Sequence, residues 1–465
     1  MKKVLPVAVL AAMAGVNSAQ AVHVNPDGLG QVLLFPYYTA QEGQDTYIQI
    51  VNTTNQFKAV KVRYLEAYNS REVLDFNLYL SPRDHWSALV TADANGDGAV
   101  QTTSDTSCIV PNFVSNNPVP FRNYEYSGPD GDSVDGVERT LEGYVEVIEM
   151  GEVVMGTQNW PAAIKHVNGV PGDCSVLNAA WNAGGRWAVS GDNQPADGLQ
   201  PPTGGLYGYG VIINVDEGTD ATYDAVALDN FNNIAFHTEP GSLDPGLDDG
   251  IPLYDVIDGN QVISGVAGPS GGASAGLNAV SALIMHDTIN NDYVLEPSID
   301  AGTDWVVTFP TKRDYVNSGV VATAPFTNIW SRTQSRACES FDAVYYDREE
   351  GQENVDILDV SPRPPGDEPI SLCYEANVLT FEGSDVLGSA IATDFDLASG
   401  FDNGWMKIDF TSGRAPLVAG ANSFSGLPVI GFAVQKYVNG DVGGLLSNYV
   451  GNVTHKATRS VSSAP

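Results

Sequence analysis

The chain has 465 residues, of which 57 are acidic and 22 basic, and its formal net charge at pH 7 is −35. A surface with this charge repels nucleic acid and anionic lipid, so neither is expected as a partner. Since 43% of the residues are hydrophobic and only 17% are charged, the chain can bury a large core and does not have the composition of an acidic disordered protein.

The first 21 residues read MKKVLPVAVLAAMAGVNSAQA. Two lysines, a short apolar run and small residues at the end are typical of a secretory signal peptide, with cleavage expected after Ala21. No stretch of the chain reaches the roughly 18 apolar residues that a membrane span requires. We therefore expect an exported protein without a membrane span, and its 20 remaining basic and 57 acidic residues give a formal charge of −37.

The next segment has the pattern of antiparallel strands. The runs VLLFPYY, DTYIQIVNTT, KAVKVRYLEAYNS and EVLDFNLYLSP follow one another at short intervals, with Gly, Asn or Pro between them. This pattern favours β-sandwiches over alternating strands and helices. In residues 60–64 apolar side chains alternate with Lys61 and Arg63, which predicts a strand with one packed face and one face in water.

The twelve residues DANGDGAVQTTS, which begin at Asp93, resemble a calcium-binding loop. In such loops the side chains at positions one, three and five and the carbonyl at position seven bind the ion. Asp93, Asn95, Asp97 and Ala99 hold these positions, but position twelve is Ser104 where a closing carboxylate is usual. The loop is therefore either a weak structural calcium site or an empty turn between two strands.

The four cysteines, an even number in an exported chain, predict two disulfides. We favour the pairs Cys108 with Cys174 and Cys338 with Cys373, because each encloses a separate part of the chain, although other pairings are possible. No CxxC or HxxxH spacing accompanies them, which disfavours a zinc site.

Further strands are predicted at residues 142–149, 210–215, 304–309, 340–347, 378–381 and 428–437. The first of these carries Glu142, Glu146 and Glu149. Two carboxyl groups can serve as acid and base in glycoside hydrolysis, but they need a cleft and a raised pKa on one of them. The interpretation that we favour is a solvated face of the sheet.

Helical periodicity is restricted to CSVLNAAWN, for which Asp173 is the expected N-cap, and LNAVSALIMHD. Trp181 and Trp187 lie close to a pair of glycines and could offer stacking platforms for sugars, although most aromatic residues of a sandwich belong to its core. Long loops rich in Gly, Asp, Pro and Asn separate these elements.

The overlapping segments GPSGG and GASAG match the GxSxG pattern of serine hydrolases, with Ser270 and Ser274 as nucleophiles and His286 or His455 as base. A nucleophile elbow requires a sharp turn between a buried strand and a helix. In a loop rich in Gly, Ser and Ala the pattern arises easily by chance. A secreted hydrolase is therefore not the favoured hypothesis, and we do not expect an enzyme.

We expect three regions after the signal peptide of residues 1–21. They are an N-terminal β-sandwich at 22–120, a central mixed but mainly β region with short helices at 121–310, and a C-terminal β-rich region at 311–465. Strands from distant segments could share one sheet. At the start of the last region, Lys312 and Arg313 are expected to pair with carboxylates such as Asp314 or those of residues 347–350.

Several segments, in their order along the chain, resemble the S-layer-like surface proteins of marine Gram-negative bacteria. These segments are VLDFNLYLSPRDHWSALV, DTSC, EGYVEVIEMG, GGLYGYGVIINVDEG, TDWVVTFPTKRDYV, YYDREE and LCYEANVLTF. The resemblance covers nearly the whole chain after the signal peptide. It implies a secreted, acidic protein that assembles with itself into a cell-surface coat or an extracellular matrix, and it supplies no catalytic residues.

The expected function is therefore that of an exported structural protein that self-assembles. Close packing of such acidic copies requires divalent cations or salt between their carboxylates, so we expect Ca²⁺ as a structural cofactor. The alternative is a secreted carbohydrate-binding or adhesive protein whose partner is a cell-surface polysaccharide.

Overall fold

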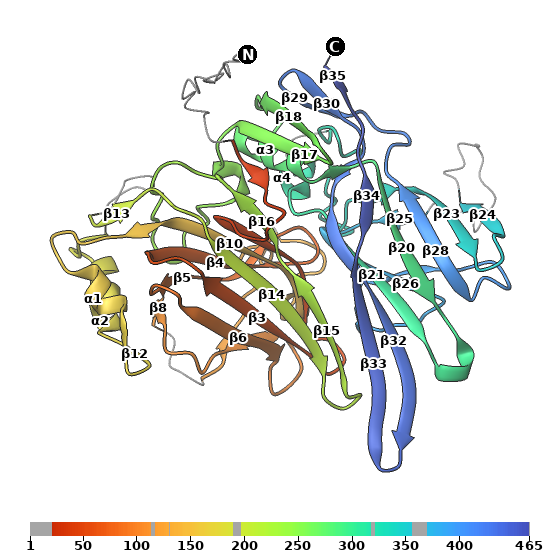
Figure 1. Ribbon diagram of the computed structural model, residues 1–465, viewed down its shortest axis with the longest axis horizontal. Helices are drawn as coiled ribbons and strands as arrows, with labels where there is room; N and C mark the ends of the chain where they lie inside the picture. The colour runs from red at the N-terminus through yellow and green to blue at the C-terminus, as the bar shows by residue number, and fades with distance from the viewer. Residues whose placement is uncertain are drawn as a thin grey trace, which may run out of the picture.

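The computed structural model describes residues 21–112, 117–129, 131–188, 197–317, 321–355 and 370–464. The expected signal peptide lies outside them, apart from Ala21. Two β-sandwiches built from mostly antiparallel sheets lie side by side, and only short helices accompany them (Figure 1). The predicted fold class is therefore confirmed. Among the described helices, none is both long and apolar enough to cross a membrane.

The first sandwich joins two sheets around one core. The larger sheet has the strand order β1 (His23–Val24), β16 (Val226–Asp229), β2 (Val32–Thr39), β10 (Glu142–Val153), β4 (Phe57–Glu66), β5 (Glu72–Leu80) and β8 (Cys108–Val110), with β13 (Leu199–Gln200) beside β10. The opposite sheet has the order β15 (Thr219–Asp224), β14 (Leu206–Asn214), β3 (Gln44–Asn52), β6 (His85–Ala92), β7 (Ala99–Thr102) and β9 (Val119–Pro120).

The second sandwich also has two main sheets. The first has the order β24 (Gln352–Val355), β23 (Asp342–Asp347), β28 (Asn403–Asp409), β20 (Thr288–Val294) and β34 (Lys456–Thr458). The other has the order β27 (Thr393–Phe395), β26 (Ala376–Phe381), β21 (Gly302–Thr308), β32 (Ile430–Val442) and β33 (Leu445–Thr454).

The sheets cross both expected region boundaries. Strands β10, β14 and β16 come from the region 121–310 but pair with strands of the region 22–120, and β15 joins the same sheet through β14. Strands β20 and β21 pair with strands of the region 311–465. Strands from distant segments therefore do share one sheet, a possibility that the sequence left open. Central strand β21 is buried on both faces, since Trp305 packs in the core of the second sandwich and Val306 in that of the first.

The remaining elements are short. The helices are α1 (Trp160–Ile164), α2 (Cys174–Trp181), α3 (Ala275–Leu283), α4 (Lys312–Val316) and the 3-10 turns η1 (Val137–Leu141), η2 (Leu247–Asp249) and η3 (Pro297–Ile299). The minor strands are β11 (His166–Val167), β12 (Val170–Pro171), β17 (Leu253–Asp258), β18 (Gln261–Val266), β19 (Met285–His286), β22 (Glu339–Ser340), β25 (Ser371–Leu372), β29 (Leu417–Ala419), β30 (Asn422–Phe424), β31 (Leu427–Pro428) and β35 (Val461–Ser463). Helices α2 and α3 confirm the two helical segments expected from the sequence.

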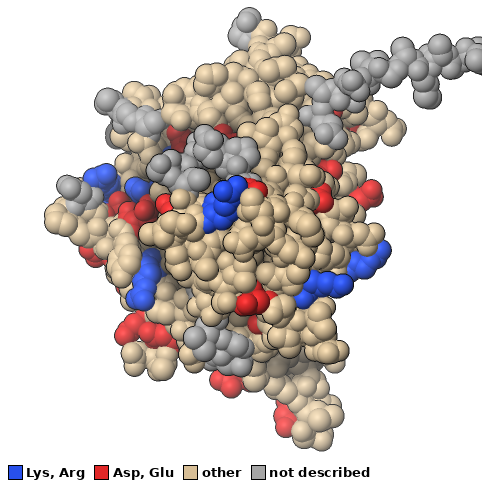
Figure 2. All heavy atoms as spheres, turned by 90° about the vertical axis from the view of Figure 1, so that its left-hand side faces the viewer, with Lys and Arg blue, Asp and Glu red and all other residues tan. Residues whose placement is uncertain are grey.

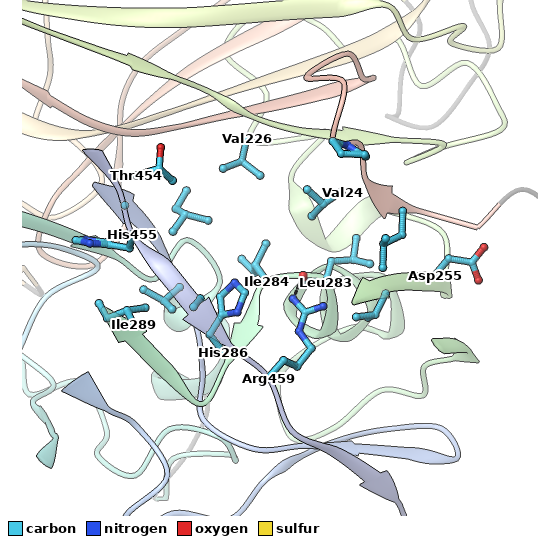
Figure 3. Close-up of a pocket in the computed structure, with 17 residues that line it drawn as sticks. Val24, Val226, Asp255, Leu283, Ile284, His286, Ile289, Thr454, His455 and Arg459 are labelled. Carbon is cyan, nitrogen blue, oxygen red and sulfur yellow. Dashed lines mark hydrogen bonds between the residues drawn. The ribbon is translucent and has the colours of Figure 1, made fainter. Parts of the chain in front are cut away.

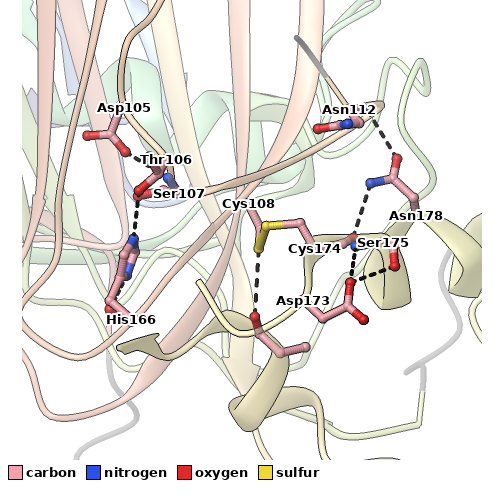
Figure 4. Close-up of a disulfide and its surroundings, with 12 residues drawn as sticks. Asp105, Thr106, Ser107, Cys108, Asn112, His166, Asp173, Cys174, Ser175 and Asn178 are labelled. Carbon is pink, nitrogen blue, oxygen red and sulfur yellow. Dashed lines mark hydrogen bonds between the residues drawn. A yellow bond between two sulfur atoms is a disulfide. The ribbon is translucent and has the colours of Figure 1, made fainter. Parts of the chain in front are cut away.

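Both expected disulfides are present, and the first joins β8 to α2 (Figure 4). Cys174 is the first residue of α2, directly after its N-cap Asp173, whose carboxylate accepts a hydrogen bond from the backbone N–H of Ser175 at 3.0 Å. The predicted cap is therefore confirmed. The disulfide between Cys108 and Cys174 anchors α2 on the edge of the larger sheet. Two disulfides are typical of a protein from an oxidising, extracellular compartment.

The prediction of a wet face on β4 is wrong. Lys61 and Arg63 do point away from the core of the first sandwich, but both are buried. The Lys61 ammonium donates to Asp75 at 3.0 Å and to the backbone carbonyl of Glu239. The loop that contains Glu239 thus covers this face of β4. Ion pairs within the protein stand where the sequence predicted contact with water.

Candidate functional site

The loop predicted to bind calcium forms the turn between β6 and β7, where Ala92 pairs with Ala99. The Asp93 carboxylate accepts hydrogen bonds from the backbone N–H groups of Asn95 and Asp97 at 2.9 and 3.0 Å. Within the described part of the chain, no three His, Cys, Asp or Glu side chains are placed to hold a metal ion. A calcium site at Asp93, Asn95, Asp97 and Ala99 therefore stays a prediction.

The three glutamates of β10 do not lie on a solvated face, because all three are buried. Glu149 forms an ion pair of 2.7 Å with Lys58, and Glu146 forms one of 2.9 Å with Arg63. Burial raises the pKa of the Glu146 carboxyl to about 7, against the opposing effect of Arg63. The preference for a solvated face was wrong because residues far along the chain cover this side of the sheet.

Glu142 links the two sandwiches. Its carboxylate accepts hydrogen bonds from the Tyr37 hydroxyl at 2.8 Å, from the Ser389 hydroxyl at 2.6 Å and from the Ala390 backbone N–H at 3.1 Å. Burial raises the pKa of this carboxyl as well. Because its carboxylate oxygens accept hydrogen bonds from both sandwiches, Glu142 holds the two sandwiches together, which is a structural role.

The two serines of the GxSxG segments make contacts typical of loop and helix-cap residues. Ser274 is the N-cap of α3 and accepts from the Leu277 backbone N–H at 3.0 Å. Ser270 exchanges hydrogen bonds with the Asn278 side chain. Among their described hydrogen-bond partners there is no histidine ring, so this geometry gives the hydrolase hypothesis no support.

The tryptophans considered as sugar platforms belong to a core cluster. Trp187 is fully buried, and the centroid of its ring lies 4.3 Å from the centroid of the Trp160 ring. Trp181 is partly buried and donates its Nε1–H to the Tyr79 hydroxyl at 2.9 Å. Trp187 therefore offers no face for a sugar, and Trp181 packs against the rings of Trp187 and His237.

Lys312 and Arg313 make contacts with backbone carbonyls. Lys312 is buried and donates to the carbonyl of Tyr374 at 2.9 Å, and Arg313 donates to the carbonyl of Ser70 at 2.9 Å. Burial lowers the pKa of Lys312 to about 8, while the nearby Glu375 carboxylate opposes this shift. Arg313 therefore helps to join the two sandwiches, whereas the contact of Lys312 lies within the second sandwich.

A cavity of about 310 Å³ lies where the two sandwiches meet (Figure 3). The first sandwich contributes Val24 and Val226, and the second contributes Ile289, Ile430 and other apolar side chains. This size lies at the lower end of the range for small-molecule sites, and an apolar wall with a few polar groups is typical of them.

Two histidines and one arginine supply polar groups to the cavity wall. His455 is satisfied within the protein, since its ring nitrogens lie 2.9 Å from the carbonyl oxygen of Val306 and 3.0 Å from the side-chain nitrogen of Asn291. His286 has a buried Nδ1 without a hydrogen-bond partner among the described residues. Burial lowers the pKa of both rings to about 4, so both are neutral at pH 7.

The hairpin of β32 and β33 extends beyond the rest of the protein (Figure 1). Its two-residue turn, Gly443 and Gly444, has positive φ at both positions, which glycine tolerates best and which suits a tight hairpin. The two apolar side chains that flank the turn are exposed, Val442 by 59% and Leu445 by 72%. We call these two residues the hairpin tip.

The base of this hairpin is held by the turn that follows β14. Lys436 forms an ion pair of 3.1 Å with Glu217, and the Asn448 side chain donates to the Glu217 carbonyl at 2.7 Å. Leu446 lies against Gly218, where an added Cβ would come within 2.5 Å of the leucine side chain. The first sandwich therefore supports the hairpin as far as Leu446, the residue directly after Leu445 of the tip.

The charged residues on the outer side of the first sandwich are scattered. Figure 2 shows that most of this face belongs to uncharged residues, with carboxylates and a few basic side chains spread among them. The strong negative charge of the chain therefore does not form a single acidic patch on this face.

Comparisons of the chain with protein-family models, curated proteins and solved structures find no match.

Sequence reasoning missed the hairpin tip, the cavity and a stacked aromatic pair formed by Tyr346 of β23 and Trp405 of β28. A signal for the tip was available, because the two glycines at 443 and 444 lie between apolar residues. No local signal marks the cavity, since its lining comes from segments spread over most of the chain.

Proposed function

We propose that the chain is an exported structural protein that assembles with copies of itself into a cation-dependent layer at the cell surface or in an extracellular matrix. The observation that carries this proposal is the projecting hairpin of β32 and β33 with its exposed apolar tip. Exposed apolar groups on a β-hairpin favour contact with another chain, because such a contact removes apolar surface from water. The two disulfides agree with an extracellular location.

The proposed role of calcium follows from the charge of the chain. Copies with a formal charge near −37 repel one another unless cations screen or bridge their carboxylates. The turn at Asp93 serves in this proposal as a structural calcium site. Without a closing carboxylate, its affinity should lie in the millimolar range of extracellular modules.

The test is negative-stain microscopy and size-exclusion chromatography of the purified protein across a range of calcium concentrations. Val442→Ser with Leu445→Ser should raise the protein concentration needed for assembly by about tenfold or more, because two exposed apolar contacts are lost. The matched control is Val167→Ser with Val170→Ser, which changes two exposed valines of another hairpin and should assemble normally.

A wild-type protein that stays monomeric at every calcium concentration would rule out the proposed layer. If the wild type assembles but the tip variant assembles equally well, the contact lies elsewhere. The variant Asp93→Ala with Asp97→Ala tests the calcium site separately, since it should need more calcium for the same assembly. An unchanged calcium requirement and melting temperature would identify this loop as a plain turn.

A second candidate function, carbohydrate binding, is favoured by the stacked aromatic pair of Trp405 and Tyr346. Their rings are stacked with centroids 4.5 Å apart, and Trp405 is 41% exposed. Cross-strand pairing places Gln352, Tyr346, Trp405 and Asp292 in one row across the sheet. An aromatic face flanked by amide and carboxylate groups suits a sugar ring and its hydroxyls.

Titration with neutral polysaccharides should change the tryptophan fluorescence of the wild type and not that of Trp405→Phe. Tyr124→Ala, which removes an exposed tyrosine elsewhere, is the control and should behave like the wild type. If no polysaccharide changes the fluorescence or retains the protein on a column, the pair serves only as a cross-strand contact within the sheet.

A further inference from the structure

We propose that the cavity between the two sandwiches binds a small amphipathic monocarboxylate, such as a medium-chain fatty acid. Its apolar body would occupy the cavity, and its carboxylate would contact Arg459. This site is independent of the hairpin tip and of the proposed assembly.

The apolar lining determines the body of the ligand. Val24, Val226, Leu283, Ile289 and Ile430 face the cavity from both sandwiches (Figure 3). A volume of about 310 Å³ lies at the lower end of the range for small-molecule sites and leaves room for an acyl chain of moderate length. Water in an apolar space of this kind is readily displaced by an apolar group, which favours such a ligand.

Arg459 determines the head group. It is the one cationic side chain among the residues that line the cavity. Its Nε donates to the carbonyl of Met285 at 2.8 Å, and its Nη2 donates to the carbonyl of Leu283 at 2.7 Å. These two bonds fix the guanidinium plane, and neither uses Nη1. A carboxylate can therefore accept from Nη1 in a charge-assisted hydrogen bond without displacing either bond.

The other polar groups of the wall agree with an anionic head at this end. His286, with its unpartnered Nδ1, lies beside Arg459 in Figure 3, which gives a second hydrogen-bonding group close to the guanidinium. Asp255 lies at the far side of the view, and its carboxylate accepts from the Ser264 hydroxyl at 2.6 Å. The Asp255 carboxylate thus lies away from the guanidinium. Burial lowers the pKa of Arg459, and the carboxylates of Asp258 and Asp287, which do not line the cavity, oppose this shift.

The consequence for the protein is a link between its two halves. A ligand in this cavity would contact β1 and β16 of the first sandwich and β20 and β32 of the second at the same time. Binding should therefore raise the melting temperature of the whole protein, since the ligand binds the folded state alone.

Isothermal titration with octanoate, octanol and octylamine tests the proposal on the intact protein. Octanoate should bind about tenfold or more tightly than octanol, and octylamine more weakly than both, because only the carboxylate gains a charge-assisted bond. Arg459→Met should reduce octanoate binding to the level of octanol. Arg186→Met, which removes an exposed arginine of the first sandwich, is the charge-matched control and should leave all three affinities unchanged.

A second variant keeps the test decisive if Arg459→Met proves unstable. Val226→Phe fills the cavity from the other sandwich without touching Arg459, and it should abolish binding of octanoate and octanol alike. The proposal is overturned if none of the three compounds binds, if octanoate and octanol bind equally, or if Val226→Phe leaves octanoate binding unchanged.

Discussion

Replacing Arg139 with methionine is expected to lower the free energy of unfolding by about 3–5 kcal/mol, the usual cost of leaving a buried charge without its partner. The Arg139 side chain is fully buried and forms ion pairs of 2.9 Å with Glu66 and 3.0 Å with Asp132. It also donates to the Asn69 side chain, and its guanidinium lies 4.0 Å from the centre of the Tyr126 ring. Methionine fills much of the space but leaves both carboxylates uncompensated.

Urea unfolding at pH 7 measures this effect, and the matched control is Arg186→Met. Arg186 is half exposed and lies 3.4 Å from Asp197, so its loss should change stability by only about 0–1 kcal/mol. The double variant Arg139→Met with Glu66→Gln should lose less than the sum of the two single variants, because the pair is removed together. Equal effects of Arg139→Met and Arg186→Met would contradict the assignment of Arg139 as a buried structural cation.

Replacing Asp304 with asparagine is expected to change the pH dependence of stability. Asp304 lies on β21, is fully buried and accepts a hydrogen bond from the Leu387 backbone N–H at 2.9 Å. Burial raises the pKa of its carboxyl from 3.8 to about 6. The folded protein therefore holds this proton up to a higher pH than the unfolded chain does, and the carboxyl favours folding at low pH.

This contribution is fully present below about pH 4 and is lost as the pH rises through 6. The shift corresponds to about 3 kcal/mol in total. Between pH 4 and pH 8 the Asp304→Asn variant should therefore gain about 2–3 kcal/mol relative to the wild type, because asparagine does not ionise.

The measurement is urea unfolding of both proteins at several pH values, with the difference between them taken at each pH. Asp220→Asn, at an exposed position of β15, is the control, and its difference from the wild type should not vary with pH. A constant difference for Asp304→Asn as well would show that its carboxyl loses its proton at the same pH in the folded and unfolded chains.

Much of the secondary structure could be predicted because its signals are local. Alternating polarity marked β4 and β5, and β-branched runs such as DWVVTF marked the buried strand β21. The N-cap Asp173 and the apolar run after it marked α2. The disulfide pairs followed from the even count and from their separation along the chain.

What covers each face of a strand could not be predicted in the same way. The alternation around Arg63 shows that this side chain points away from the core, but its partner Glu146 is 83 residues further along the chain. The same holds for Glu142, whose partners Ser389 and Ala390 belong to the other sandwich. Polar side chains on a strand therefore predicted a face exposed to water. In the structure, these side chains are buried and paired with polar groups of another segment.

The candidate sites also differ in whether local sequence or long-range contacts form them. The turn at Asp93 is a local motif, so its residues and its position between two strands were visible from the sequence. The cavity is built by β1, β16, β20, β32 and α3 together, and the long-range contacts that bring them together are set by the complete fold.

The direction of the projecting hairpin has a mechanical consequence. Strand β32 continues from the tip into the protein, where Ile430–Lys436 pair with all seven residues of β21. A pull on the tip along the strand axis would load these interstrand hydrogen bonds in shear, so that they resist together and not one after another. Since Thr308 at the end of β21 donates to the Pro36 carbonyl at 2.6 Å, part of that tension would pass into the first sandwich.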